Sequence, residues 1–481
     1  MNSKILQIVT LCAYLVLGCS EKNKTAEKSA EGPRDKPNII FIMADDLGYG
    51  DIEPFGQKYI KTPNLNRLAK EGMRFTQHYA GNTVCAPSRC ALMTGMHMGH
   101  AEIRGNKQAN PFGQIPLSDQ AVTVSSLLKK AGYNTALIGK WGLGVENSTG
   151  DPLKQGFDLY YGYLDQVLAH NSFPEYLLRN GKKEELKNAV VYEDSTKWHR
   201  GLGSYSETKI DYSQDFFISE ALNFIDRQEK EPFFLYFPVT IPHDNGEAPE
   251  GFRQEIPNLG DYENKEWSRE TKAYAAMISR LDRDVGKILD KLKEKEIDEN
   301  ALVIFTSDNG PMPNVEFTNF FNSNGIFKGG KRDLYEGGIR VPLIARWPGK
   351  IKPNTTSAHI SAFWDFLPTA CDLASVSPPK NVDGISFLPA LLGEKQTTHD
   401  YLYWEFPEQG YSVAMRKGKW KAIRRNMAKD SQAPIELYNL EVDPGEKNNV
   451  AEDFPQVVAE LENLLKSSRN PSEEFPIQEG Y

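Results

Sequence analysis

Four short apolar runs, each ending in polar residues, limit most strongly what this chain can fold into. Asn38–Met43 (NIIFIM) is followed by Ala44 and then by Asp45 and Asp46. Ala301–Phe305 (ALVIF) continues into Thr306–Gly310 (TSDNG). Uninterrupted apolar runs of this length are typical of strands that are buried on both faces of a sheet. The other two runs, Thr135–Gly139 and Phe233–Thr240, carry Lys140 and His243 just beyond their ends.

Stretches with a helical pattern separate these runs, at Val122–Lys130, Asp215–Glu229 and Thr271–Glu294. This alternation predicts an α/β protein with an open, largely parallel sheet. Ligands of such sheets bind beyond the carboxyl ends of the strands. The four polar clusters are therefore expected to meet at one edge of the sheet.

The N-terminus has the pattern of an export signal. Lys4 precedes an apolar run, Ile5–Leu17, that is too short to span a bilayer comfortably and is followed by Gly18 and Cys19. This resembles a bacterial lipoprotein signal, which predicts removal of residues 1–18 and lipidation of Cys19. The protein would then be held on a membrane in the periplasm or at the outer membrane and cell surface. An ordinary cleaved secretory signal is the alternative, and it also places the protein outside the cytoplasm.

Residues 19–36 are rich in Glu, Lys, Ser and Ala and predict a flexible tether. The whole chain has 56 basic and 65 acidic residues, a formal charge of -9, which argues against nucleic acid as its partner. Beyond the tether, three cysteines remain, without the spacing of a disulfide framework. Cys90 and Cys371 are expected to be buried as small apolar residues.

The polar residues after two of the strands suggest a metal site. Asp45, Asp46, Asp308 and Asn309 would gather at the predicted edge of the sheet. Three carboxylates brought together repel one another, whereas a divalent cation makes them ligands. Their hard oxygen atoms favour Ca²⁺, with Mg²⁺ possible, over Zn²⁺. For either pair alone, a turn or helix cap after a strand explains the residues equally well.

Residues 85–95 read CAPSRCALMTG, and the spacing of Cys85, Pro87 and Arg89 is hard to explain by structure alone. Pro87 and Ser88 lie where a helix would start, so backbone N–H groups there could face an anion. A free Cys at a helix start, with Arg89 in a surface ion pair, is the alternative. The block resembles the signature of the type I sulfatases. In that family the Cys is oxidised by a maturation enzyme to formylglycine, whose hydrated aldehyde is the nucleophile.

The resemblance continues along nearly the whole chain after the tether. It implies the alkaline-phosphatase-like fold: a large domain with a mostly parallel mixed sheet flanked by helices, and a small C-terminal domain with an antiparallel sheet and a helix. We expect these domains at 37–385 and 386–481. The segments that carry the resemblance are Asn38–Gly48, Cys85–Gly95, Gly139–Gly144, Pro242–His243, Thr306–Gly310, Phe327–Pro342 and Leu437–Asn449.

The resemblance also implies the site and the reaction. The reaction is hydrolysis of a sulfate ester with cleavage of the S–O bond, and His243 would protonate the leaving oxygen. An aldehyde hydrate suits an all-oxygen Ca²⁺ site, whereas a soft thiolate does not. By residue matching, Asp45, Asp46, Cys85, Asp308 and Asn309 take the metal positions, Cys85 is also the nucleophile, and Arg89, Lys140, His243 and Lys331 take the sulfate-binding and proton-transfer positions.

One position departs from the family pattern. Most members read Gly-Lys-x-His-Leu-Gly, but Gly139–Gly144 reads GKWGLG, so Gly142 stands where the family has a His that takes a proton from the nucleophile. Three explanations remain open: another His or a metal-bound carboxylate substitutes, water takes the proton, or the enzyme is impaired. The variant resembles a subgroup of bacterial carbohydrate sulfatases that also carry the blocks found here at Gly99–Asn106 and Ala169–Asn171.

Substrate choice is expected to come from loops. His100, Arg104, His170 and Asn171 are polar groups in such segments and could hydrogen-bond sugar hydroxyls. Alternatively, His100 and Arg104 brace their loop and His170 caps a turn. Trp404 and Glu405 could form a sugar platform and its acceptor, or Trp404 could belong to the core.

The sequence therefore predicts a lipid-anchored sulfatase that acts on sulfated glycans, removing sulfate from a terminal sugar. A phosphoester or phosphonate hydrolase of the same superfamily is the alternative enzyme, although such enzymes typically keep a Thr or Ser nucleophile or a second metal cluster. A catalytically silent lipoprotein that binds sulfated glycans is a third possibility, which Gly142 leaves open.

Overall fold

The computed structural model describes residues 36–109 and 113–477. The predicted signal peptide (1–18), the lipidation site Cys19 and nearly all of the tether (19–36) lie outside these residues, so these features stay predictions. In the described chain, no helix is both long and apolar enough to cross a membrane.

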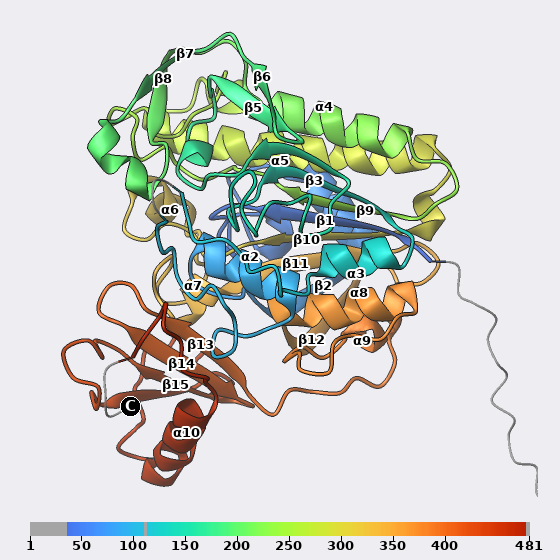
Figure 1. The fold of residues 1–481 in the computed structure, drawn as a ribbon. Coiled ribbons are helices and arrows are strands. Elements are labelled where there is room, and N and C mark those ends of the chain that lie inside the picture. The colour runs from blue at the N-terminus through green and yellow to red at the C-terminus, as the bar shows by residue number, and fades with distance from the viewer. Residues whose placement is uncertain (1–35, 110–112, 478–481) are drawn as a thin grey trace, which may run out of the picture. The chain divides into compact units, whose positions relative to one another are not determined.

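A ten-stranded mixed sheet organises most of the described chain (Figure 1). Its middle is parallel, as the apolar runs predict, and antiparallel pairs lie on either side. From one edge to the other the strands are β12 (Thr355–Ala362), β2 (Met73–Tyr79), β11 (Arg340–Arg346), β10 (Ala301–Ser307), β1 (Asn38–Ala44), β9 (Phe233–Pro238), β3 (Asn134–Lys140), β4 (Leu159–Tyr163), β5 (Tyr176–Arg179) and β6 (Lys182–Glu185).

The four predicted strands are the four central ones, β10, β1, β9 and β3, and every residue of β1, β9 and β10 is buried. β1 pairs in parallel with β10 on one side and with β9 on the other. In this register Ala44 lies beside Ser307, and Met43 lies beside Pro238. The carboxyl ends of the strands are therefore level, and the residues that follow them start from neighbouring positions.

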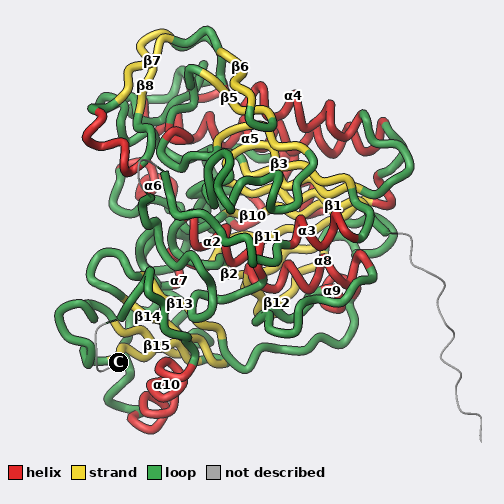
Figure 2. Tube along the Cα trace, in the orientation of Figure 1, coloured by secondary structure: helices red, strands yellow, loops and turns green. Residues whose placement is uncertain are grey.

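Helices cover both faces of the sheet (Figures 1 and 2). α4 and α5 pack together on one side, whereas α2, α3 and α8 pack together on the other. The helices are α1 (Pro63–Glu71), α2 (Cys85–Thr94), α3 (Val124–Lys130), α4 (Ser213–Asp226), α5 (Arg269–Glu294), α6 (Glu316–Phe321), α7 (Glu336–Ile339), α8 (Phe366–Ala374), α9 (Leu388–Leu392) and α10 (Pro455–Ser467).

Local capping explains where two of the three predicted helices begin, α3 and α5. α3 starts two residues later than predicted because Thr123 caps it, accepting a hydrogen bond from Ser126 N at 3.2 Å. α5 starts two residues earlier because Ser268 caps it through Thr271 N, also at 3.2 Å. The apolar residues of α5 recur at helical spacing and face the core.

A second, antiparallel sheet follows towards the C-terminus, as the family resemblance implies. α10 packs on it, and the two enclose a small apolar cluster of their own. The predicted boundary between residues 385 and 386 is not tested by this arrangement. The strands of this sheet are β13 (Leu402–Phe406), β14 (Ser412–Lys417), β15 (Trp420–Arg424) and β16 (Ile435–Asn439), and a separate hairpin is formed by β7 (Ala189–Tyr192) and β8 (Ser204–Thr208).

Trp404 and Glu405 do not form a sugar platform, so that expectation is wrong. Both side chains are fully buried in β13. The Trp404 ring packs against Tyr79 and Trp364, with centroids 5.3 and 5.6 Å away. Trp404 belongs to the core, which is the alternative that the sequence left open. Cys90 and Cys371 are buried free thiols, as predicted.

Candidate active site

The ends of β1 and β10 bring four of the predicted metal ligands together. Asp46 N donates a hydrogen bond to Asp308 Oδ1 at 3.2 Å, and Asn309 Nδ2 donates to Asp46 Oδ1 at 2.7 Å. Asp45, Asp46, Asp308 and Asn309 are all buried. This proximity follows from the parallel register, because Asp45 and Asp308 come directly after the paired residues Ala44 and Ser307.

The first turn of α2 reaches the same place. Cys85 Sγ lies 3.4 Å from Asp45 Oδ1, and Ser88 Oγ donates to the carbonyl oxygen of Asp308 at 2.5 Å. Arg89 is fully buried; one of its NH groups donates to Lys140 O at 2.6 Å and the other to Asp308 Oδ2 at 2.8 Å. The alternative of a surface ion pair for Arg89 is thereby excluded.

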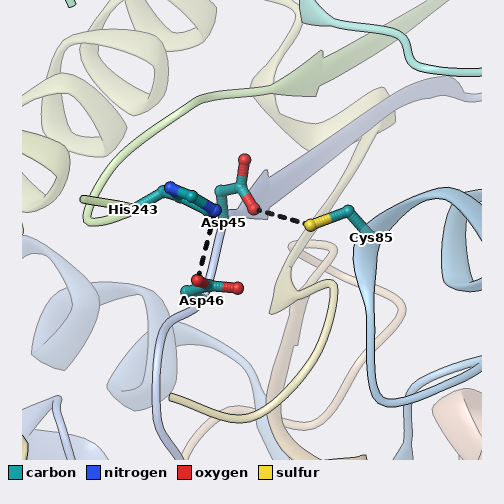
Figure 3. A group of neighbouring side chains, drawn as sticks. All are labelled: Asp45, Asp46, Cys85 and His243. Atoms are coloured by element: carbon teal, nitrogen blue, oxygen red, sulfur yellow. Dashed lines mark hydrogen bonds and ion pairs between the residues drawn. The ribbon is translucent and has the colours of Figure 1, made fainter. Parts of the chain in front are cut away.

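Two lysines and a histidine complete the cluster. Lys140 Nζ lies 2.7 Å from Asp45 Oδ2, and Lys331 Nζ lies 2.8 Å from Asp46 Oδ2. Lys331 Nζ is also 2.9 Å from His243 Nε2, which in turn is 3.4 Å from Asp46 Oδ2. Figure 3 shows the side chains of Cys85 and His243 approaching the two aspartates from different elements. One ligand atom from each of these four residues lies within 4.8 Å of the others.

The three carboxylates differ in their electrostatic state. Burial alone would raise the pKa of Asp45, but Lys140 and other cationic groups around it hold it well below its usual range. The pKa of Asp46 is likewise lowered, against burial, chiefly by Lys331. Burial, reinforced by the charge of Asp45, raises the pKa of Asp308 to about 7. Burial and the crowding of the carboxylates thus disfavour the charged form of Asp308.

The thiol and the imidazole are both held neutral. Burial, together with the charge of Asp45, raises the pKa of the Cys85 thiol far above its usual range. Burial and the nearby Lys331 lower the pKa of His243 to about 4. In this state His243 Nε2 accepts a hydrogen bond from Lys331, and Nδ1 donates to Asp244 O at 2.5 Å.

These residues fit a hard divalent cation. Asn309 Oδ1 is buried and has no hydrogen-bond partner in the described chain, although Asn309 Nδ2 donates to two acceptors. An unpaired buried acceptor beside three carboxylates is a costly arrangement that a cation would relieve. The donors are carboxylate and amide oxygens, which suit Ca²⁺ or Mg²⁺.

Of the predicted substrate-binding residues, Arg104 and Asn171 are buried and hydrogen-bonded within the protein, whereas His100 and His170 are partly exposed. Arg104 is buried, and its side chain donates to Ala101 O at 2.9 Å and lies 3.2 Å from Glu405 Oε1. His100 Nδ1 lies 2.8 Å from Asp383 Oδ1, and its side chain is 27% exposed. Arg104 thus braces its loop, as the alternative predicts, and binding of a sugar by this residue stays a prediction.

Asn171 is also used internally. It is fully buried, and its Nδ2 donates to Ser204 Oγ at 3.1 Å and contacts Ser206 Oγ at 3.3 Å. These contacts join the segment of Asn171 to β8, and binding of a sugar by Asn171 stays a prediction. His170 is different, since its ring stacks on that of His243 with centroids 4.5 Å apart and an interplanar angle of 14°.

Two residues in this region were not predicted from the sequence. Glu247 Oε2 lies 3.0 Å from His170 Nδ1, on a loop whose sequence has no recognisable motif. Gln166 places its carboxamide directly over Gly142. The signal for Gln166 in the sequence was the glycine at position 142, because the space that a larger side chain would take there has to be filled by another residue.

Comparison with known proteins places this geometry in context. A family model described as Sulfatase matches residues 37–376, and one described as N-sulphoglucosamine sulphohydrolase, C-terminal, matches residues 324–471. An N-acetylgalactosamine-6-O-sulfatase of Bacteroides thetaiotaomicron is 30% identical over 97% of this chain and 98% of its own length. An N-acetylgalactosamine-6-sulfatase of Canis lupus familiaris is 33% identical over 93% of this chain and 83% of its own.

One solved structure resembles this chain in both fold and sequence. It is the crystal structure of Ps i-CgsB in complex with k-i-k-neocarrahexaose, with a TM-score of 0.74 and 30% identity. The likeness covers 92% of this chain and 95% of the other.

Proposed function

The chain belongs to the sulfatase family and is a sulfuric ester hydrolase, and we propose that it removes sulfate from a terminal sugar of sulfated glycans. The observation that carries the proposal is the meeting of Cys85, three carboxylates and three cationic side chains at the ends of β1, β3 and β10. Relatives named for sulfated N-acetylgalactosamine, and a neighbour solved with neocarrahexaose, support a sugar as the substrate.

The proposed nucleophile is formylglycine, formed from Cys85 by a maturation enzyme. The state of the thiol supports this, because a buried thiol with a strongly raised pKa is a poor nucleophile. A hydrated formylglycine supplies one hydroxyl that attacks sulfur and a second whose deprotonation releases sulfate and restores the aldehyde. In the proposal Arg89 orients this side chain from the next turn of α2.

The proposed metal is Ca²⁺, held by Asp45, Asp46, Asp308 and Asn309 together with the converted Cys85. Its charge would offset that of the sulfate oxygens as the bond to the sugar breaks. The raised pKa of Asp308 and the unpaired Asn309 Oδ1 support a cation in this position.

The lysines and His243 supply the remaining chemistry in the proposal. Lys140 and Lys331 provide positive charge for the sulfate oxygens while negative charge moves to the leaving alcohol. His243 protonates that alcohol at Nε2. Its imidazole is neutral in this structure, but an anionic sulfate beside it would raise its pKa and favour the charged form that an acid requires.

Mass spectrometry of the peptide that contains Cys85 tests the nucleophile. Protein from a host that has the maturation enzyme should lose on the order of 18 Da relative to the thiol. The same preparation should release sulfate from singly sulfated monosaccharides or disaccharides, and the active members of that panel identify the sugar. An unmodified thiol, with no sulfate released from any of them, would contradict the enzymatic proposal.

Thermal unfolding with and without Ca²⁺ tests the metal site. Ca²⁺ should raise the melting temperature of the wild type but not of Asp308→Ala, which should also lose turnover. Asp290→Ala is the matched control, because Asp290 is 70% exposed and lies on the outer side of α5. Equal stabilisation of wild type and Asp308→Ala by Ca²⁺ would refute the assignment.

Export as a lipoprotein is part of the same proposal and rests on Gly18 and Cys19. The wild type should partition with membranes, whereas Cys19→Ser should be found in the soluble fraction. Cell fractionation measures this, and an unchanged distribution would favour the ordinary secretory signal.

A further inference from the structure

The backbone at Gly142 leaves a space that another side chain fills. Gly142 has a φ of +77°, in the left-handed region that favours glycine. A Cβ at this position would lie 2.0 Å from Gln166 Nε2 and 2.5 Å from Gln166 Cδ. The carboxamide of Gln166 therefore occupies the place where a side chain at position 142 would begin.

Both segments that meet at this place reach the active site. Gly142 comes two residues after Lys140, the last residue of β3, whose side chain contacts Asp45 and whose carbonyl oxygen accepts a hydrogen bond from Arg89. Gln166 comes four residues before His170, whose ring stacks on that of His243. The amide of Gln166 therefore lies between two segments that each contact active-site residues.

The amide of Gln166 lacks a partner where one would be expected. Gln166 is only 6% exposed, and its Nε2 has no hydrogen-bond partner in the described chain. An unpaired buried donor destabilises a fold, and a Leu or Met side chain would fill the same space without that cost. The choice of an amide here points to an acceptor that is not among the described residues, such as a bound ligand.

The surrounding loop holds Gln166 in place. Its backbone N–H donates to Gln114 Oε1 at 3.0 Å. The preceding residue, Asp165, accepts hydrogen bonds through Oδ1 from Val167 N at 2.8 Å and from Leu168 N at 2.9 Å. The position of the amide is therefore set before any ligand arrives, which favours binding.

We propose that Gln166 is a sulfate-binding residue, whose Nε2 donates a hydrogen bond to an oxygen of the sulfate group in the substrate and in the released product. The inference rests on the proposed function and deepens it. A sulfate group offers only acceptors, which matches the unpaired donor. Since an amide does not titrate, Gln166 replaces the binding contact of a side chain at position 142 but cannot accept a proton.

Inhibition by inorganic sulfate tests this inference on the matured enzyme. Gln166→Leu and Gln166→Met should weaken sulfate inhibition about 10- to 100-fold and raise KM for a sulfated sugar by a similar factor. Their melting temperatures should equal or exceed that of the wild type, because the substitution removes an unpaired buried donor.

Gln155→Leu is the matched control. Gln155 is another buried glutamine, but its Nε2 is fully used, donating to Ser118 O at 3.1 Å and to Thr149 O at 3.0 Å. This variant should melt at a lower temperature, with unchanged inhibition by sulfate. Unchanged inhibition and KM in both Gln166 variants would overturn the inference, and so would a loss of stability in them as large as that of Gln155→Leu.

Calorimetric titration with sodium sulfate separates this inference from the proposed function. The measurement uses protein whose Cys85 is unconverted, so it does not depend on turnover. Weaker sulfate binding by Gln166→Leu than by the wild type would support the inference even if no sulfated glycan is cleaved. Equal binding by the two proteins would overturn it even if the enzyme is active.

Discussion

Asp51 shows how a single buried carboxyl imposes a pH dependence on folding. It accepts hydrogen bonds from Gly48 N, Tyr274 Oη and Ser323 Oγ at 2.7, 2.5 and 2.5 Å. Burial outweighs these contacts and raises its pKa from 3.8 to about 6. The folded state therefore binds the Asp51 proton more tightly than the unfolded state does. The stability that this gives is complete below about pH 4 and is lost as the pH rises through about 6.

Asp51→Asn should remove this component. The amide can accept from Gly48 and Tyr274 through its oxygen and donate to Ser323, so the local geometry is retained. Between about pH 4.5 and pH 7, the free energy of unfolding of the wild type should fall by about 2 kcal/mol more than that of the variant. Denaturant titrations at the two pH values measure this, and equal pH dependence would show that Asp51 is already ionised in the folded protein.

Among the secondary-structure elements, α1 depends on a residue of α5 for its N-terminal cap. Thr62, the residue before α1, makes no side-chain capping contact. Instead, Asp282 of α5 accepts from Leu65 N at 2.7 Å and from Asn64 N at 3.2 Å. A buried carboxylate at a helix N-terminus satisfies otherwise unpaired N–H groups and favours the helix dipole. The packing of α1 against α5 thus includes hydrogen bonds from the first turn of α1 to Asp282, in addition to apolar contacts.

Asp282→Ala should lower the free energy of unfolding by about 1–2 kcal/mol without changing turnover, because α1 carries none of the active-site residues. Asp290→Ala on the same helix is the control. Asp290 is largely exposed, and among the described residues its ion pair is with Arg67, so its loss should change stability by less than about 0.5 kcal/mol. Equal effects of the two substitutions in denaturant titrations would argue against a capping role.

At the scale of the whole molecule, a buried ion cluster ties the antiparallel sheet to the loop that carries Lys331. Lys421 Nζ of β15 lies 2.9 Å from both Glu336 Oε1 and Glu446 Oε1, and all three side chains are fully buried. Against burial, Lys421 and Arg340 lower the pKa of Glu336 to about 2. Glu336 begins α7, five residues after Lys331.

Lys421→Met should therefore affect both stability and catalysis. It removes the cation that pairs with the buried Glu446 and one of the two cations beside Glu336, which should cost about 3–5 kcal/mol of unfolding free energy. Turnover should also fall, because the loop that positions Lys331 loses an anchor. Lys417→Met on the neighbouring strand is the control, since Lys417 is 43% exposed and pairs with the exposed Glu460. Loss of stability with unchanged turnover would show that Lys331 is held independently of the antiparallel sheet.

Sequence reasoning worked where a pattern has a simple spatial consequence. Apolar runs long enough to be buried strands predicted β1 and β10, and the parallel register brings Asp45 beside Asp308. It could not decide the role of Arg104, because a polar residue in a loop does not reveal whether its partner is a substrate or a distant residue such as Glu405. The position of Gln166 could not be predicted, since its contact with Gly142 depends on the backbone conformation there.

The burial of Cys85 has a consequence for the timing of biosynthesis. Its side chain is 4% exposed, and Cys85 and the eight residues after it are buried within α2. An enzyme that oxidises this side chain has to reach it while the segment is still unfolded, before α2 forms and packs at the end of β1. In the proposed maturation, conversion and folding therefore compete, and a copy that folds first keeps its thiol. The active fraction of a preparation would then depend on the rate of Cys85 conversion relative to the rate of folding.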